Sequence, residues 1–306
     1  MESNTSLEKL HILPFFIKVD NKLFIFNIVF FFLIYLTGIL ENIVIIVVIC
    51  LNLHLHTPMY LFICNLAIID ICYTSLIVPK LLYILLSGNT IISFTECYIQ
   101  LYFFFQTATI EDMVIFIMAY DRYVAICHPL KYHQILNRKK CILITMAIWV
   151  GGCVNSSLFT SSISKMFFCS SINIHQLFCD AKALIKISCG GTEMFYIILY
   201  TECVVTGLWP VLCGLMSYVK IIRVIVHIKS NDGRRKAFST CSSHLIVMII
   251  YYGSSVSVYM TPPSDRYKVL EQIFTFFYST VVPLLNPLIY SLRNKEVKNS
   301  LRKLLK

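Results

Sequence analysis

Charged residues are scarce in this chain. Only 14% of the 306 residues are Asp, Glu, Lys or Arg, whereas about a quarter is usual for a soluble domain. Hydrophobic residues make up 58%, and the mean hydropathy is +0.75. A chain with so little polar surface needs lipid around it, so the composition predicts an integral membrane protein.

Several motifs are also missing. The sequence contains neither HExxH nor GxSxG, so we expect no membrane enzyme. It has no CxxC pair or Cys/His cluster, so we expect no transition-metal site. We interpret the isolated histidines, including His244, as packing or boundary residues. Internal repeats and matching broken half-helices are absent as well, which makes a transporter the less favoured alternative.

What the sequence does contain is long apolar runs. A membrane helix needs about 20 apolar residues, and period-two alternation, the mark of a membrane barrel, is absent. We therefore predict an all-α membrane protein, a seven-transmembrane helix bundle in one domain, 1–306, with an N-terminal tail (1–22), the bundle (23–291) and a C-terminal tail (292–306). The predicted spans are 23–51, 58–86, 98–121, 140–162, 194–220, 238–261 and 269–291.

The distribution of basic residues predicts the orientation, because Lys and Arg accumulate on the cytoplasmic side. The segments after the third and fifth spans and the tail hold 17 of the 26 Lys and Arg residues. The N-terminus is then outside, without a cleavable signal in the first 22 residues. The net charge of +10 fits contact with anionic lipid rather than nucleic acid. After the last span, a short amphipathic helix is expected along the membrane surface.

The outside segments contain modification candidates. Four of the 13 cysteines lie there, namely Cys97, Cys169, Cys179 and Cys189. An even number in an oxidising compartment favours two bridges, although four cysteines allow three pairings. Asn4-Thr5-Ser6 is a glycosylation acceptor on the outer tail, whereas the similar pattern at Asn155 lies inside a predicted span and is discounted.

Four acids fall inside predicted spans: Asp70, Glu111, Asp112 and Glu202. Each costs about 2.5–3.5 kcal/mol at the centre of a membrane helix, so each needs a partner or a function. At the inner end of the third span, Asp121-Arg122-Tyr123 ends the apolar run, and Pro129 follows, which cannot continue a helix.

Four stretches are specific enough to indicate a family. PMYLFICNLAIID, MAYDRYVAICHPLKY, KAFSTCSSHL and PLLNPLIYSLRN closely resemble the signature set of vertebrate odorant (olfactory) receptors, members of the rhodopsin-like (class A) G-protein-coupled receptors. The resemblance covers essentially the whole chain in the expected order. Two features depart from it: Glu41 stands where the family usually has glycine, and the N-terminal tail lacks the common aliphatic motif.

The resemblance implies roles for particular residues. It pairs Cys97 with Cys179 and Cys169 with Cys189, holding a lid over a ligand cavity. It places Asp70 and Glu111 together; we expect them to bind a sodium ion or share a proton, and the alternative is a polar core with Asn42 and Asn286 that only specifies packing. No other cofactor is expected. The implied coupling and switch residues are Asp121, Arg122, Tyr123, Tyr218, Asn286, Pro287 and Tyr290.

The resemblance also implies a pocket for a small, largely apolar volatile molecule in the outer half of the bundle. The aromatic residues among its lining could equally pack against neighbouring helices. Expected partners are an odorant, a stimulatory olfactory-type G protein that raises cAMP, and lipids, in the plasma membrane of olfactory sensory cilia. A class A receptor for a ligand outside olfaction is the nearer alternative. The implied ligand-binding residues are Phe104, Phe105, Ala108, Thr109, Glu202, Thr206, Tyr252, Val256, Tyr259, Ser279 and Thr280.

Overall fold

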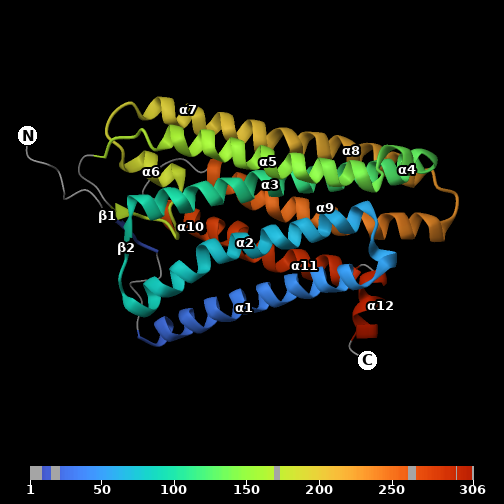
Figure 1. The fold of residues 1–306 in the computed structure, drawn as a ribbon, viewed down its shortest axis with the longest axis horizontal. Helices are drawn as coiled ribbons and strands as arrows, with labels where there is room; N and C mark the ends of the chain where they lie inside the picture. The colour runs from blue at the N-terminus through green and yellow to red at the C-terminus, as the bar shows by residue number, and fades with distance from the viewer. Residues whose placement is uncertain (1–8, 15–20, 169–172, 261–266, 294, 305–306) are drawn as a thin grey trace, which may run out of the picture.

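The structure, a computed structural model, describes residues 9–14, 21–168, 173–260, 267–293 and 295–304. Long helices run side by side along the molecule, with the N-terminal strand at one end and the last helix turned across the other (Figure 1). The seven predicted spans correspond to α1 Asn21–Leu51, α2 Pro58–Ser87, α3 Phe94–Cys127, α5 Arg138–Ile163, α7 Thr192–Glu202 continued by α8 Trp209–Val226, α9 Asn231–Met260, and α10 Lys268–Phe276 continued by α11 Val282–Arg293.

Six of these spans are long and apolar enough to cross a membrane, and α9 contributes a shorter apolar stretch, His244–Tyr259. Their outward faces are apolar, as lipid contact requires. The exposed fractions of three such side chains, Phe32, Val47 and Leu143, are 51%, 43% and 67%. The predicted seven-helix bundle is confirmed. The third helix begins earlier than predicted, because Ser93 and Glu96 form a reciprocal cap at its start.

Helix α3 is the central element, since it packs against α2, α5, α8 and α9. Its approach to α5 is close because a small residue lies at the contact. A Cβ atom on Gly152 would come within 2.5 Å of Ile110 Cγ1. Next to it, the hydroxyl of Ser156 donates a hydrogen bond to the carbonyl oxygen of Tyr102. Small residues are what allow membrane helices to pack this tightly.

The fifth span (α7 and α8) and the seventh span (α10 and α11) each contain a π-helical turn, in which a backbone N–H bonds to the carbonyl oxygen five residues earlier. One covers Cys203–Leu208, closed by Trp209 N–H to Val204 O, and the other covers Phe277–Val281. A proline follows each turn, Pro210 and Pro283, and a proline cannot donate the usual bond to the residue four before it. The missing bond gives a physical cause for the local π geometry.

The outer end is closed by short elements. Strand β1 (Lys9–Ile12) pairs antiparallel with β2 (Ile91–Ser93) and parallel with β3 (Asn173–Ile174). Helix α6 (Ala181–Ile187) lies within the second outer loop. The predicted disulfide Cys97–Cys179 ties this loop to α3. Cys189 is also disulfide-bonded, and its predicted partner, Cys169, lies outside the described residues, as does Asn4.

The cytoplasmic end carries the short elements η2 (Leu53–Leu55), η3 (Pro129–Lys131) and α4 (Tyr132–Ile135). The predicted tail helix is α12 (Lys295–Leu304), which contacts α1 and α11. Its Val297 is buried, and the hydroxyl of Ser300 lies 3.2 Å from His54 Nε2. The side chains of α12 thus fix it against the inner end of the bundle.

Candidate functional site

At the cytoplasmic end of α3, Asp121 and Arg122 are joined directly. Arg122 Nη2 lies 2.6 Å from Asp121 Oδ2, and the carboxylate is completely buried. The Tyr132 hydroxyl donates to the other oxygen, Asp121 Oδ1, at 2.7 Å. Burial and the adjacent Asp121 carboxylate raise the pKa of the Tyr132 phenol, which therefore stays a donor. Asp121 is thus satisfied on both oxygens, and Arg122 is held at its own helix.

Tyr218 on α8 is engaged elsewhere. Its hydroxyl lies 2.7 Å from His244 Nδ1 on α9, and both side chains are buried. Tyr218 is therefore held by α9, the sixth span, in this conformation. The predicted switch residue Tyr123 lies against His128, at 3.2 Å between its hydroxyl and Nε2, and beneath the Lys220 ammonium.

A polar layer lies in the middle of the bundle. Asn286 Nδ2 on α11 donates to both oxygens of Asp70 on α2, at 3.1 and 3.2 Å. Asn42 Nδ2 on α1 donates to the carbonyl oxygen of Pro283, at 3.2 Å. Glu111 is 1% exposed and close enough to Asp70 for their charges to interact. Neither Glu111 oxygen has a hydrogen-bond partner among the residues that the structure describes.

The outer half of α3 carries two of the predicted pocket residues as packed aromatics. Phe104 is fully buried and lies 4.6 Å, centroid to centroid, from Phe178 of the second outer loop. Phe105 packs against Phe159 of α5 at 4.0 Å. These two rings therefore join α3 to the loop and to α5.

A polar group lies beside these aromatics. Asn155 Nδ2 on α5 donates to Glu202 Oε1 and lies 3.2 Å from Thr109 Oγ1. Thr206, in the π-helical turn, donates to the backbone oxygen of Glu202 at 2.9 Å. Asn155 thus connects two predicted pocket residues, Thr109 of α3 and Glu202 of α7, and a third, Thr206, bonds to the backbone of Glu202.

The predicted pocket residues of the sixth and seventh spans differ in burial. Ser279 and Thr280, in the second π-helical turn, are buried. Tyr252 is buried, and its hydroxyl lies 3.4 Å from the backbone oxygen of Asp112. Val256, by contrast, is 47% exposed, so the structure does not place it in this buried layer. The remaining members, Ala108 and Tyr259, are partly buried.

The match to known proteins follows this geometry. The family model described as "Olfactory receptor" matches residues 31–306. The chain is 40% identical over 301 residues to Olfactory receptor 1G1 of Gorilla gorilla gorilla, covering 98% of this chain and 96% of that protein. It is 42% identical over 272 residues to Olfactory receptor 8D1 of Homo sapiens, covering 89% and 88%.

This chain belongs to the olfactory receptor family. It is a multi-pass membrane receptor and not an enzyme. The predicted family is therefore confirmed, and odorant ligands and G proteins are its partners in general terms.

This olfactory receptor uses two polar residues that the sequence patterns passed over. The sequence predicts only a packing or boundary role for His244, which is buried and also bonds to the Tyr218 hydroxyl. Asn155 stood out only as a discounted glycosylation pattern, yet it bridges Thr109 and Glu202. A single polar residue in an apolar run carries no periodic signal, and only its burial in a span suggests that it has a partner. The side chain of the predicted switch residue Tyr290 lies outside the described part.

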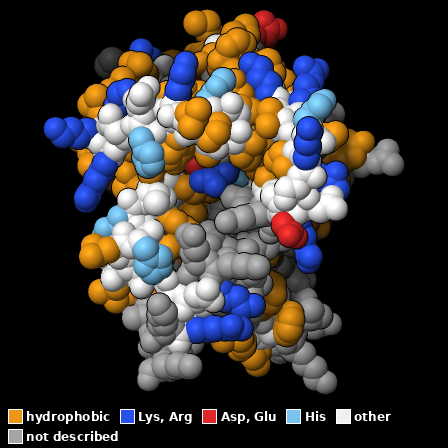
Figure 2. Space-filling model, turned by 90° about the vertical axis from the view of Figure 1, so that its right-hand side faces the viewer, with side chains coloured by type: hydrophobic (Ala, Val, Ile, Leu, Met, Phe, Trp, Pro, Cys, Tyr) orange, Lys and Arg blue, Asp and Glu red, His pale blue; other side chains and the backbone are white. Residues whose placement is uncertain are grey.

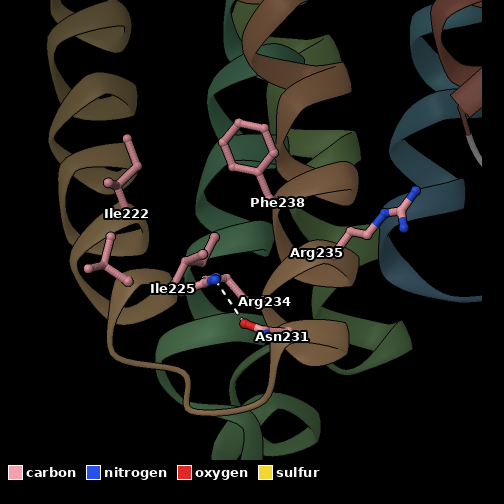
Figure 3. A pocket seen from close by; sticks show the side chains of 7 residues that line it. Ile222, Ile225, Asn231, Arg234, Arg235 and Phe238 are labelled. Carbon is pink, nitrogen blue, oxygen red and sulfur yellow. Dashed lines mark hydrogen bonds between the residues drawn. The ribbon is translucent and has the colours of Figure 1, made fainter.

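The inner end of the receptor also carries a basic surface. Lys and Arg side chains are spread over its rim, and acidic side chains are few (Figure 2). Between α8 and the start of α9 lies a surface cavity of about 510 Å³. Ile222 and Ile225 come from α8, and across the loop Asn231 accepts a hydrogen bond from Arg234 at 2.9 Å (Figure 3). Phe238, on the next turn of α9, is 62% exposed.

Proposed function

We propose that this olfactory receptor binds small, largely apolar organic molecules between the outer halves of its helices and activates a stimulatory olfactory-type G protein, which raises cAMP. The observation that supports it best is that one continuous helix, α3, carries both the predicted ligand contacts and Arg122. Displacement of α3 or of its partner α9 at the outer end is transmitted to the pairs at the inner end, because packed helices move as rigid elements.

In the proposed cycle, the resting state is the one described above. Arg122 pairs with Asp121, and Tyr218 bonds to His244. Outward movement of α9 separates His244 from Tyr218, which then turns toward Arg122 as the arginine leaves Asp121. The exposed residues around Phe238 and the basic rim receive the G protein.

The test is cAMP accumulation in cells that carry the receptor and a stimulatory olfactory-type G protein, against a chemically diverse odorant panel. We expect responses to apolar volatile compounds. In Arg122→Ala the response should fall by more than about tenfold, because alanine supplies neither the positive charge nor the hydrogen-bond donors of arginine. Surface staining controls for expression. A response that persists unchanged in Arg122→Ala contradicts the proposed cycle.

The polar group at Glu202 favours ligands with a hydroxyl or amine next to an apolar body. Glu202 is already hydrogen-bonded to Asn155, so a ligand donor would share that carboxylate. Glu202→Gln should lower responses to amines and alcohols while hydrocarbons keep theirs. An unchanged response profile removes Glu202 from the pocket.

We further propose that Asp70 and Glu111 hold a sodium ion or share a proton, which favours the resting state. The donor chemistry fits either: the layer offers carboxylate and amide oxygens, and Glu111 lacks a donor partner within the described residues. Two carboxylates in a low-dielectric site need a cation or a proton between them. Ligand-free cAMP production in Glu111→Gln should lose its dependence on sodium and pH. If both dependences persist, the layer only specifies packing.

The setting we propose is the plasma membrane of olfactory sensory neuron cilia. Immunostaining of olfactory epithelium with an antibody to this receptor tests it, since a signal confined to other tissues would indicate a role outside olfaction.

A further inference from the structure

The second outer loop contains a helix that is buried, which is unusual for a loop. In α6, residues 181–185 are all buried, and the first turn is capped by Asp180, whose carboxylate accepts from the N–H groups of Lys182 and Ala183. Lys182 itself is only 1% exposed. A buried lysine is rare unless its ammonium is paired.

The partner of Lys182 is Glu271 on α10, in the seventh span. Lys182 Nζ lies 3.1 Å from Glu271 Oε1, and it donates to the carbonyl oxygen of Val258 on α9 at 2.8 Å. The second oxygen of the same carboxylate, Glu271 Oε2, lies 3.0 Å from Lys186 Nζ. One carboxylate of α10 therefore binds both lysines of α6. We call Lys182, Lys186 and Glu271 the outer ion-pair cluster.

The loop is thus anchored on two sides by different chemistry. On the α3 side the anchor is covalent, the Cys97–Cys179 disulfide, with Phe178 packed on Phe104. On the side of α9 and α10 the anchor is the outer ion-pair cluster, which can separate without breaking a covalent bond. Between the two anchors, α6 lies at the outer end of the molecule, where it contacts α7 and β3 (Figure 1).

We propose that the outer ion-pair cluster is a latch that keeps residues 180–187 closed over the bundle, and that its opening, with the disulfide as the fixed edge, admits ligands. The latch concerns access, and it rests on the proposed function only for the identity of what enters. Removing one partner of a buried ion pair leaves the other charge buried without compensation. The three members are therefore unequal.

Glu271→Gln should have the largest effect, because it leaves two lysines without their carboxylate. Lys182→Met keeps the volume and leaves Glu271 paired with Lys186, so its effect should be smaller. Lys186→Gln should change least within the cluster, since the Lys186 side chain is already 26% exposed. Lys165→Gln is the matched control, because Lys165 is an exposed lysine of the outer end without an ion pair within the described part of the chain.

Access can be measured without an odorant through a native thiol. Cys203 follows Glu202 at the first π-helical turn and lies close enough to Asp180 and Tyr259 for electrostatic interaction. A negatively charged, membrane-impermeant methanethiosulfonate can reach this thiol only from the aqueous side. The rate of its modification, followed by peptide mass spectrometry on the receptor in nanodiscs, reports opening. Hydrogen exchange of the 181–187 peptide reports closure of the loop itself.

We expect Glu271→Gln to accelerate both Cys203 modification and exchange of 181–187 by about tenfold or more, with Lys182→Met intermediate and Lys165→Gln unchanged. Glu271→Asp, which keeps a carboxylate at this position for both lysines, should stay closer to the parent rates, which separates loss of the charge from general misfolding. Equal rates in all variants would overturn the latch, and faster exchange without faster Cys203 modification would overturn its role in access. If the rates change but no odorant raises cAMP, the latch stands and the proposed function fails.

Discussion

The two ends of the receptor hold buried ion pairs of different kinds. At the outer end, Lys182 and Glu271 come from elements far apart in the sequence, and both side chains are almost inaccessible, at 1% and 3%. At the inner end, Asp121 and Arg122 are neighbours on one helix, with Arg122 15% exposed. The outer pair holds two elements together, whereas the inner pair restrains one side chain on its own helix. Release of Arg122 therefore requires no helix to separate.

The hydrogen bonds show the same contrast. The outer end adds a disulfide and a three-stranded sheet to its ion pairs. The inner end joins α8 and α9 through a single side chain, because the Tyr218 hydroxyl bonds to His244 Nδ1 at 2.7 Å and to the backbone oxygen of Cys241 at 3.5 Å. A stable outer end and an easily released inner end suit a receptor whose ligand site must keep its shape while its coupling surface moves.

Loss of the disulfide should have the largest effect. Cys179→Ser opens a link between residues 82 positions apart, and a native disulfide typically stabilises by about 2–4 kcal/mol. The expected result is a strongly lowered melting temperature of the purified receptor and reduced surface expression. The matched control is Cys213→Ser, which replaces a partly buried free cysteine of α8. Equal melting temperatures in the two variants would contradict the proposed stability of the outer end.

Acid should strengthen the outer end. Burial, and next the Glu271 carboxylate, raise the pKa of Asp180 from 3.8 to about 6. Because the folded receptor binds this proton more tightly than the unfolded chain, stability falls as pH rises from about 4 to 6 and is constant above that. The shift corresponds to at most about 3 kcal/mol.

Asp180→Asn removes this titration but keeps a good helix cap. Exchange of 181–187 in the parent should be slower at pH 5 than at pH 7, after correction for the intrinsic rates. In Asp180→Asn the corrected rates at the two pH values should converge on the slower one. If the parent shows the opposite trend, the titration of the buried Asp180 carboxylate does not control this segment.

The smallest effect is expected at the inner end. His244→Phe removes the hydrogen bond to Tyr218 and keeps a ring of similar size, at a cost to the resting state of about 0.5–1.5 kcal/mol. Ligand-free cAMP production should rise a few-fold. Tyr218→Phe removes the same bond but also the hydroxyl needed in the active state, so its odorant-stimulated maximum should fall. Unchanged basal activity in His244→Phe would mean that this bond does not restrain helix six.

Much of the fold could be predicted from the sequence, because a membrane span is a long signal. Twenty apolar residues are read reliably, whereas α6 and β1, with seven and four residues, are short segments whose structure depends on what they pack against. The exposed position of Val256 has a similar cause: the family resemblance grouped it with Tyr252 and Tyr259, but the rotation of α9 in the bundle depends on tertiary packing.

The site was predicted best where it is local in the sequence. Asp121 and Arg122 are adjacent, so their pairing needs no tertiary information. The Asn155 bridge and the outer ion-pair cluster join residues from different helices and a loop, through single side chains without a repeating pattern. Their partners became visible only when the helices were placed side by side.

The two π-helical turns have a consequence for how the ligand site varies in length. A π-turn carries one residue more than an α-helix needs for the same angular advance. Deleting one residue between Cys203 and Leu208 would therefore convert the turn to regular α-helix, and the side chains before and after it would keep their orientation in the bundle. The wall that carries Thr206 can then change its contour by losing or gaining a residue, and the bundle around it need not be rebuilt.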